Sequence, residues 1–493
     1  MGSADIVGGM DALTPQDATR YWLSHRTRND LFLLYCFTDA GRSLADLRAV
    51  VAERSARIPD LTVRVRERRF AYPVWVWGSA GDRVVDHTVS GSTWEEVVAA
   101  LGGLLGGGVR ADECPWRVHL FRGVTGAPGG EDPALVVVLQ VSHALADGQR
   151  AAGIARALFS ESDSSWPVDN GRGAGAPRRL AGLYSGSADR GESCGGWVFP
   201  GAERVAGLVV QARVVGEELF SIMSFPVRLV RTVVRGLAAA RARRALAELT
   251  ERSAVPPPAA SLPATMLNRS PEPTSHIVRM LVRDDLRVPG YTVTVVALTA
   301  IGAALDRYLA QRGEPAELSA QVSMAVPARN KHSRNNYRDL AVELHGAERD
   351  PRRRAERIAA DLESRRVRSG HPLTAVGGRV TDVLPAPVLR RDIATYPIDQ
   401  VPDTLTGHTV VSSVNRGPAD LTFGSAPVRF TAGFPALGTV MHLTHGIHGL
   451  GSTITVSIHA DPEVIPDIDV YAALLNTTLT ETVDALSRVP ADE

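Results

Sequence analysis

His143 follows a short apolar run and precedes an acid and a glycine, Asp147 and Gly148. The run, residues 135–141, is rich in β-branched residues and apolar on both faces, which predicts a buried strand. Residues 149–159 carry their apolar side chains on one stripe at helical spacing, which predicts a helix. The histidine therefore lies where a core strand ends and a helix begins. A carboxylate there can cap the helix, and a glycine permits a tight turn.

An imidazole at this place has two interpretations. Its ordinary pKa lies near neutrality, so it can accept a proton as a general base. A lone histidine at a strand terminus can also be structural, with its hydrogen bonds satisfied. The spacing Ser142-His143-x-x-x-Asp147-Gly148 favours the catalytic interpretation. It resembles the His-His-x-x-x-Asp-Gly motif of the CoA-dependent acyltransferase superfamily, which includes nonribosomal peptide condensation domains.

Further segments resemble the wax ester synthase/diacylglycerol acyltransferase (WS/DGAT) family of that superfamily. Cys114-Pro-Trp116-Arg117 resembles the Pro-Leu-Trp-Arg segment that precedes the motif. Other similar segments follow the family's order, at residues 10–17, 119–123, 265–269, 290–298, 303–309, 325–327 and 411–418. The resemblance spans most of the 493 residues.

The resemblance implies the architecture and the activity. The fold class is α/β, with two chloramphenicol-acetyltransferase-like domains of mixed sheets flanked by helices and an active-site tunnel at their interface. Residues 1–160 would form the N-terminal domain that carries the motif, 161–260 a flexible linker and basic helical crossover, and 261–493 the C-terminal domain. The chain would be an acyl-CoA-dependent O-acyltransferase that moves an acyl group to a hydroxyl or amine acceptor. Acyl-CoA would be a co-substrate, and no cofactor is expected.

The same resemblance implies roles for individual residues. His143 would be the general base, and Asp147 would support the turn next to Gly148 by pairing with an arginine. We choose Arg329 as that partner, with Lys331 as the alternative. The other expected site residues are Ser142, Thr294, Ser413 and Asn415 for substrate binding and Trp116 as a motif-supporting residue.

Three departures from the family concern the tunnel. Ser142 replaces the first histidine of the motif, Thr294-Val295 replaces Asn-Asp, and residues 413–418 read Ser-Val-Asn-Arg-Gly-Pro where the family has Asn-Val-Pro-Gly-Pro. These changes predict an acceptor more polar than a long-chain alcohol or diacylglycerol, because a buried polar site rejects a ligand that leaves its groups unpaired. They also leave two alternatives: a non-catalytic relative that binds acyl chains or a carrier, and a condensation-type enzyme that uses carrier-protein thioesters.

Composition restricts the partners and the compartment. The chain has 54 basic and 54 acidic residues, which argues against nucleic acid as a partner. Its 3 cysteines form no metal pair or disulfide framework, so a reducing compartment is expected. The start shows no signal peptide, and no uninterrupted apolar stretch reaches the roughly 20 residues that span a bilayer. We expect a cytoplasmic protein.

A histidine series near the C-terminus needs a separate interpretation. His442, His445 and His448 are spaced by three, which would suit a metal on a helix. The surrounding sequence is β-like, and on a strand His442 and His448 face one way and His445 the other. We therefore expect no metal site, and a histidine that faces the tunnel is the more plausible of the two roles.

The region from 202 to 251 reads as a helix that ends before three prolines at 256–258. Arginines between Arg228 and Arg244 alternate there with apolar residues. One interpretation is peripheral contact with the inner face of an anionic membrane. The other is a crossover helix between the domains that turns an arginine face to solvent.

The pass along the chain predicts the remaining elements. Helices are expected at 15–24, 44–55 and 93–105, and strands at 31–37, 320–326, 409–413 and 452–459, with a further segment at 75–77. The resemblance to the family implies a strand at 290–298 followed by a helix at 303–309.

Overall fold

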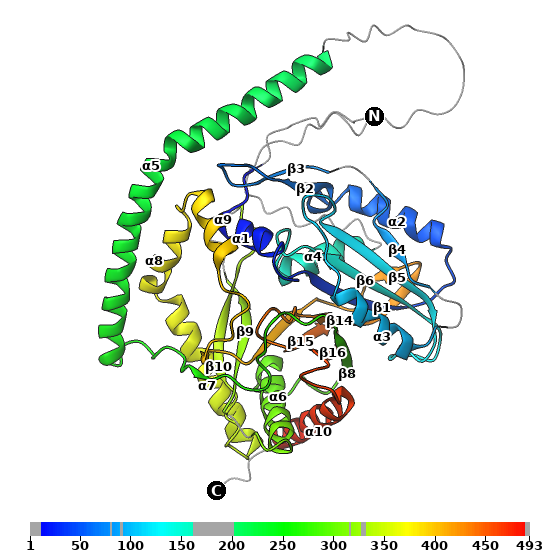
Figure 1. The fold of residues 1–493 in the computed structure, drawn as a ribbon. Coiled ribbons are helices and arrows are strands. Elements are labelled where there is room, and N and C mark those ends of the chain that lie inside the picture. Colours follow the sequence, from blue (N-terminus) through cyan, green and yellow to red (C-terminus); the bar gives the residue numbers. More distant parts are fainter. Residues whose placement is uncertain are drawn as a thin grey trace, which may run out of the picture.

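The computed structural model describes residues 11–78, 81–88, 92–160, 202–314, 317–326 and 332–488. Its main strands form two six-stranded sheets flanked by helices (Figure 1). The first sheet has the order β13 (Thr422–Phe423), β14 (Ala426–Phe434), β1 (Leu31–Thr38), β6 (Ala134–Val141), β5 (Trp116–Val124), β4 (Val84–Asp86). The second has the order β10 (Tyr337–Glu343), β9 (Ser319–Ala325), β12 (Thr409–Asn415), β15 (Leu443–Leu450), β16 (Thr453–Ala460), β8 (Ile277–Arg283). Each sheet mixes parallel and antiparallel pairs, which confirms the predicted α/β class.

Smaller elements complete the fold. Two short pairs join β2 (Val63–Arg66) to β3 (Val74–Trp77) and β7 (Leu262–Pro263) to β11 (Thr404–Leu405). The helices are α1 (Pro15–Leu23), α2 (Leu44–Ala56), η1 (Pro59–Thr62), α3 (Trp94–Leu105), α4 (Gly148–Leu158), α5 (Ala202–Glu251), α6 (Val293–Ala310), α7 (Pro351–Gly370), α8 (Pro372–Thr381), α9 (Ala386–Thr395) and α10 (Ile468–Ser487).

Strand β6 is buried at every residue because both faces of the first sheet are covered. Leu135 and Leu139 pack in the cluster that includes α2 and α4. Val136 and Val138 pack in the cluster that includes α3 and Val278 of β8. The continuous apolar run in the sequence thus corresponds to a strand between two hydrophobic layers, as predicted.

Strand β14 ties the two halves of the chain together. It follows β12 in the C-terminal half, yet it pairs with β1 in the first sheet, where Thr431 lies opposite Tyr35. It also contacts β15 and β16 of the second sheet. The first sheet therefore combines strands from residues 1–160 and from residues 261–493, and the sheets do not coincide with the two segments of chain.

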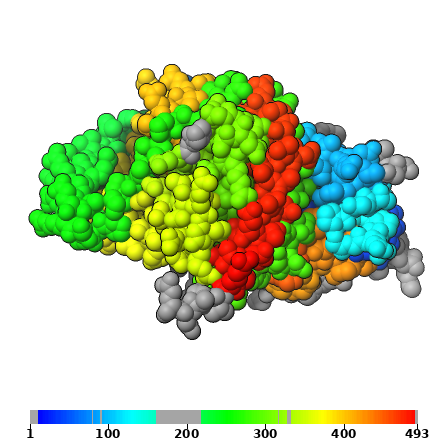
Figure 2. Space-filling view, turned by 90° about the horizontal axis from the view of Figure 1, so that it is seen from below, coloured from blue at the N-terminus to red at the C-terminus, as the bar shows by residue number. Residues whose placement is uncertain are grey.

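The second sheet packs against α6, α7 and α10. Their apolar side chains share one core with β9, β15 and β16. Figure 2 shows the side of this layer, where α10 (red) lies along α7 (yellow-green).

The structure corrects the expected strand at 290–298. Most of these residues form the first part of α6, where the Thr292 side chain accepts a hydrogen bond from the backbone N–H of Val295. The β-branched residues fit the helix because the hydrophobic core surrounds it, and packing outweighs their β-propensity. Among the described residues α6 is the one helix long and apolar enough to cross a membrane, and 67% of it is buried, as in a core helix.

Helix α5 confirms the predicted helical region and lies on the outside of the molecule. It runs along α8 and is bent (Figure 1). Pro226 lies inside the helix, where a proline bends it because it has no backbone N–H to donate. Thr232 and Arg235 hydrogen-bond to backbone carbonyls at and beyond the end of α8. The large apolar residues exposed between 219 and 237 are Leu219, Phe220, Ile222, Met223, Val227, Leu229, Val230, Val233, Val234 and Leu237. The solvent side of α5 is therefore apolar as well as basic.

Candidate functional site

A cavity of about 710 Å³ lies between the two sheets. The motif residues His143, Asp147 and Gly148 line it from the N-terminal half. Thr294 of α6 and Ser413 of β12 line it from the C-terminal half, and their hydroxyl oxygens are 2.9 Å apart. The structure thus brings five of the expected site residues to one cavity.

Three other expected residues lie outside the cavity lining. Ser142 is fully buried behind the turn, where its hydroxyl accepts from the backbone N–H of Ala144. Asn415 is exposed at the end of β12 and accepts from the backbone N–H of Gly417. Trp116 is buried at the start of β5, opposite Val141, and its indole N–H donates to a backbone carbonyl of η1 at 2.9 Å. Trp116 therefore supports the end of β6.

His143 occupies the turn between β6 and α4. Its Nε2 lies 3.3 Å from the hydroxyl of Tyr337, and the two rings stack with centroids 5.5 Å apart. The Asn335 side-chain amide donates to the His143 carbonyl at 2.9 Å. The guanidinium of Arg20 lies over the other ring, 5.2 Å from the centroid of Tyr337. Residues from the C-terminal half therefore hold both the backbone and the ring of this histidine.

The imidazole of His143 is neutral near neutral pH. Burial, together with the positive charge of Arg20, lowers its pKa to about 3. A neutral imidazole has a lone pair on one ring nitrogen. The site thus provides a proton acceptor in contact with the cavity.

Asp147 holds the turn through backbone amides. One carboxylate oxygen accepts from the N–H of Arg150 at 2.9 Å, which caps α4, and the other accepts from the N–H of Asn336 at 2.7 Å. In the part of the chain that the structure describes, these amides are its hydrogen-bond partners. Arg329 and Lys331, the predicted partners, lie outside the described residues, so that pairing stays a prediction.

Asp147→Asn is expected to destabilise the fold. An asparagine has one acceptor oxygen, so its NH₂ group would face the backbone N–H of Arg150 or Asn336. We expect a loss of about 1–2 kcal/mol in the free energy of unfolding, measured in urea. Asp350→Asn is the control, because Asp350 caps α7 through one amide of Arg352 and can keep that bond. Full stability with abolished activity would contradict a supporting role.

A cluster of buried charged residues holds the loop that carries Arg334 and Asn335 against the N-terminal half of the chain. Asp60 accepts two hydrogen bonds from Arg150, at 2.8 and 2.9 Å, and a shorter one from Arg334. Asp17 accepts from the Asn335 side chain at 2.9 Å and from the backbone N–H of Arg334. These bonds fasten a C-terminal loop onto the N-terminal half beside His143.

Sequence reasoning missed Asp60, Arg334 and Tyr337. Asp17 lay in a segment that resembles the family opening, but no role was assigned to it. The missed residues are distant in sequence and follow no local pattern, so their contacts arise only on folding.

Within β15, His445 and His448 face opposite sides, as expected for a strand. His448 lines the cavity. His445 faces the core, where its Nε2 lies 2.8 Å from the Tyr471 hydroxyl. His442 lies before β15 and contacts the carboxylate of Asp461 at 2.8 Å. His448 is therefore the member of the series that faces the cavity.

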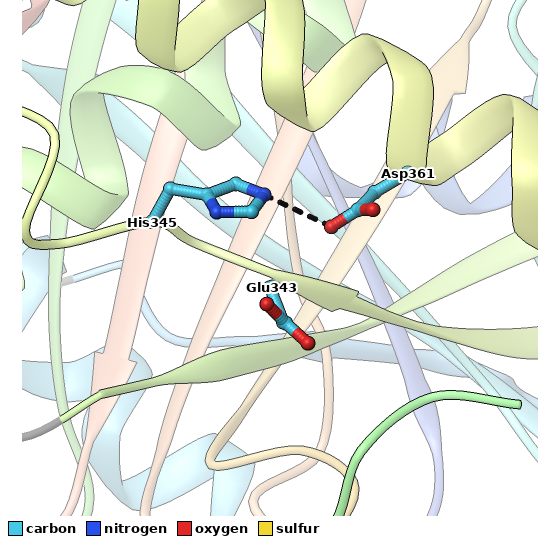
Figure 3. A group of neighbouring side chains, drawn as sticks. All are labelled: Glu343, His345 and Asp361. Carbon is cyan, nitrogen blue, oxygen red and sulfur yellow. Dashed lines mark hydrogen bonds and ion pairs between the residues drawn. The ribbon is translucent and has the colours of Figure 1, made fainter. Parts of the chain in front are cut away.

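One group of side chains has metal-ligand types. Glu343, His345 and Asp361 place their ligand atoms within 4.8 Å of one another. Figure 3 shows the His345 ring directed at Asp361, with which it hydrogen-bonds at 2.9 Å, and Glu343 beside them. None of the three lines the cavity. The group is a partly buried cluster apart from the candidate site, with His345 paired to Asp361.

Acidification is expected to destabilise the protein. Burial is the main cause that lowers the pKa of His119 to about 4 and of His143, His445 and His459 to about 3. The unfolded chain binds these protons near pH 6.5, so stability is complete above that pH and falls as pH decreases toward 3–4. Each histidine then costs on the order of 1–2 kcal/mol at pH 5.

Asp30 acts in the opposite direction. Burial raises its pKa to about 6, so its contribution favours the folded state as pH falls from about 6 to 4. The destabilisation from the four histidines together is larger than the stabilisation from Asp30 alone. We expect urea denaturation to give a lower free energy of unfolding at pH 5 than at pH 7.5, and an equal or higher value would contradict the burial of neutral imidazoles.

Known proteins share this architecture. Residues 335–482 match the family model described as the WS/DGAT C-terminal domain. The solved wax ester synthase/diacylglycerol acyltransferase from Marinobacter aquaeolei VT8 is similar over 96% of this chain and 100% of its own, with TM-score 0.58 and 16% identity. The first condensation domain of the CDA synthetase is similar over 98% of each chain, with TM-score 0.54 and 16% identity.

A mutant of the starter condensation domain of rhizomide synthetase RzmA, solved in complex with C8-CoA, is similar over 98% of this chain and 97% of its own, with TM-score 0.52 and 12% identity. No curated protein matched the sequence. At these identities the structural likeness concerns the fold, and it confirms the predicted α/β fold of mixed sheets flanked by helices.

Proposed function

We propose that this chain, which has the fold of the CoA-dependent acyltransferase superfamily, transfers an acyl group from acyl-CoA to a hydroxyl or amine acceptor. The observation that carries the proposal is His143: a neutral imidazole held at the wall of a cavity between two sheets. The match to the WS/DGAT C-terminal domain and the structural similarity to a solved acyltransferase support acyl transfer as the reaction.

In the proposed mechanism His143 is the general base. The acceptor O–H or N–H gives its proton to the imidazole while the acceptor atom attacks the thioester carbonyl. Collapse of the tetrahedral intermediate breaks the C–S bond, and the imidazolium returns the proton to the departing thiolate. The acyl group thus passes directly between the substrates, and no acyl-enzyme forms.

The surrounding residues position this step. Tyr337 holds the imidazole ring, and Asn335 holds the backbone of the turn. Gly148 brings α4 close to β12, since a Cβ added there would lie 3.3 Å from the side chain of Val414. A cavity walled by both halves can hold two substrates in line, and orientation of that kind is worth about 7–11 kcal/mol.

The acceptor is proposed to be polar. Thr294 and Ser413 face the cavity as a hydrogen-bonded pair of hydroxyls at the positions where sequence departs from the family. Small hydroxyls bind polar groups, and they do not add the apolar surface that a long-chain alcohol requires.

The test measures thioester cleavage and product together. The purified protein is mixed with acyl-CoAs of graded length and a panel of alcohols and amines, and free CoA and acylated products are quantified by mass spectrometry. Acceptor-dependent release of CoA with a matching acylated product supports the proposal. Binding without cleavage would indicate a non-catalytic relative, and cleavage only of carrier-bound thioesters a condensation-type enzyme. Efficient wax ester or triacylglycerol synthesis would contradict the polar acceptor.

We also propose that α5 contacts an anionic membrane at the cytoplasmic face. Phe220, Met223 and Val230 are more than 60% exposed on its solvent side, and Arg231 is exposed beside them. An apolar stripe flanked by arginines suits a lipid headgroup boundary. The paired change Met223→Glu and Val230→Glu is expected to abolish co-sedimentation with anionic vesicles. A dimer held by this stripe in solution, without vesicle binding, would contradict the proposal.

A further inference from the structure

Arg416 is a buried arginine in the wall of the cavity. Its side chain is 5% exposed, and it lines the cavity just after β12. Its Nη1 donates to the Thr431 hydroxyl at 2.5 Å, while its Nε–H has no partner. Within the described ranges no carboxylate pairs with it, and burial lowers its pKa.

The surroundings of Arg416 are crowded. A Cβ added to Gly433, which also lines the cavity, would lie 2.5 Å from the Nη2 of Arg416 and 2.8 Å from the Nε2 of His448. The Nδ1 of His448 is buried without a hydrogen-bond partner. A glycine at 433 thus lets an arginine and a histidine approach each other at the cavity wall, each with an unsatisfied buried nitrogen.

The two groups belong to the same cavity as the catalytic turn. Val414 lies opposite His448 in the sheet and packs beside Gly148. In the first sheet Gly433 lies opposite Leu33, whereas the end of β6 lies opposite Leu31. Leu31 and Leu33 are two residues apart on β1. Along that strand, Gly433 therefore lies about 7 Å from the end of β6, which precedes His143.

Contacts with the protein place Arg416 but do not neutralise it. Its guanidinium lies 5.2 Å from the centroid of the Tyr35 ring, and Thr431 holds one amino group. These partners carry no negative charge at neutral pH. A buried charge without a counter-ion destabilises the folded protein, so retaining one calls for an external anion.

We infer that Arg416, assisted by His448, binds a carboxylate carried by one of the two substrates. The inference rests on the proposed acyl transfer and names its substrate class: an acyl donor or an acceptor with an anionic end. Thr431 occupies Nη1, and the unpartnered Nε belongs with Nη2 to the edge that arginine uses to bind a carboxylate through two parallel hydrogen bonds. When Gly417-Pro418 is aligned with the Gly-Pro of the family element, Arg416 takes the place of the first proline of that element.

The test compares matched ligands on matched variants. The donors are succinyl-, glutaryl- and adipyl-CoA against butyryl-, pentanoyl- and hexanoyl-CoA. The acceptors are hydroxy acids against their methyl esters, tested with one neutral acyl-CoA. Arg416→Met removes the charge and keeps much of the volume. Arg429→Met is the control, because Arg429 of β14 binds carbonyl oxygens outside the cavity.

For the wild type we expect one arm, donor or acceptor, to favour the carboxylate by about 10- to 100-fold in affinity or kcat/KM. Arg416→Met should abolish that preference and still turn over the neutral partner, whereas Arg429→Met should keep it. The arm that responds identifies the substrate that carries the carboxylate. Absence of a preference in the wild type, or the same preference in Arg416→Met, would overturn the inference.

Ligand-induced shifts in melting temperature separate the two proposals. If no pair is turned over, yet a carboxylate-bearing ligand stabilises the wild type and not Arg416→Met, acyl transfer fails and the anion site stands. If neutral substrates react without any carboxylate preference, the anion site fails and acyl transfer stands. Without ligand, Arg416→Met should melt no lower than the wild type, since it removes an unpaired buried charge. A clear drop would assign Arg416 a structural role.

Discussion

Replacing His143 by alanine is expected to lower kcat/KM for acyl transfer by about 10²–10⁴-fold, the usual contribution of a general base. In the proposed mechanism the imidazole accepts the acceptor's proton, and its Nε2 contacts the Tyr337 hydroxyl at the cavity. Loss of the ring leaves the acceptor to attack without proton removal. The measurement is CoA release with an acyl-CoA and acceptor pair that the wild type turns over.

Two further variants show whether the loss is specific to the His143 imidazole. Tyr337→Phe removes the hydroxyl next to Nε2 but keeps the stacked ring. It should lower kcat/KM by about 5- to 10-fold, which corresponds to the free energy of one hydrogen bond. His345→Ala removes a histidine outside the cavity lining and should leave activity unchanged. Added imidazole should partly restore His143→Ala by entering the vacated space. Wild-type turnover by folded His143→Ala would refute the proposed mechanism.

Asp60→Asn is expected to cost about 3–5 kcal/mol of unfolding free energy, because it leaves Arg334 buried without a counter-ion. The Asp60 side chain is 3% exposed and that of Arg334 is 13% exposed. Although burial acts to raise the pKa of Asp60, Arg334 and Arg150 outweigh it and lower that pKa. The carboxylate therefore stays charged between the two arginines. Urea denaturation measures the loss.

Glu481→Gln is the matched control for this change. Glu481 also pairs with an arginine through both oxygens, but both partners are more than 40% exposed. An exposed pair contributes about 0–1 kcal/mol, so this variant should unfold nearly as the wild type does. Equal losses in the two variants would show that the Asp60 cluster is not a special support of the fold.

Asp60→Asn should also lower activity. The cluster fastens Arg334, and the adjacent Asn335 holds the His143 carbonyl. A loosened loop misplaces the base, and a displacement of about 1 Å can cost 10²-fold in rate. The loop with Arg334 and Asn335 therefore links the stability of the Asp60 cluster to the position of His143.

Local patterns in the sequence were sufficient to predict the strand, turn and helix around His143. The run before His143 is apolar on both faces, which is the property of a strand between two layers, and the acid and glycine behind it are the residues that begin a helix. Such features depend on neighbours within a few positions. The same is true of α5, whose bounds match the predicted helical region. The overall fold was predicted from the resemblance to the family, because segments similar to those of the family occur in the same order along the chain.

Features that depend on distant partners were decided by the tertiary structure alone. Residues 290–298 carry a strand-like composition, but a surrounding core turned most of them into α6. The backbone amides of Arg150 and Asn336, which hydrogen-bond to Asp147, could not be read from the sequence. Arg416 reads in the sequence as one residue of an altered motif. Its burial beside His448, permitted by Gly433 on another strand, exists only because β14 crosses from the C-terminal half to pair with β1.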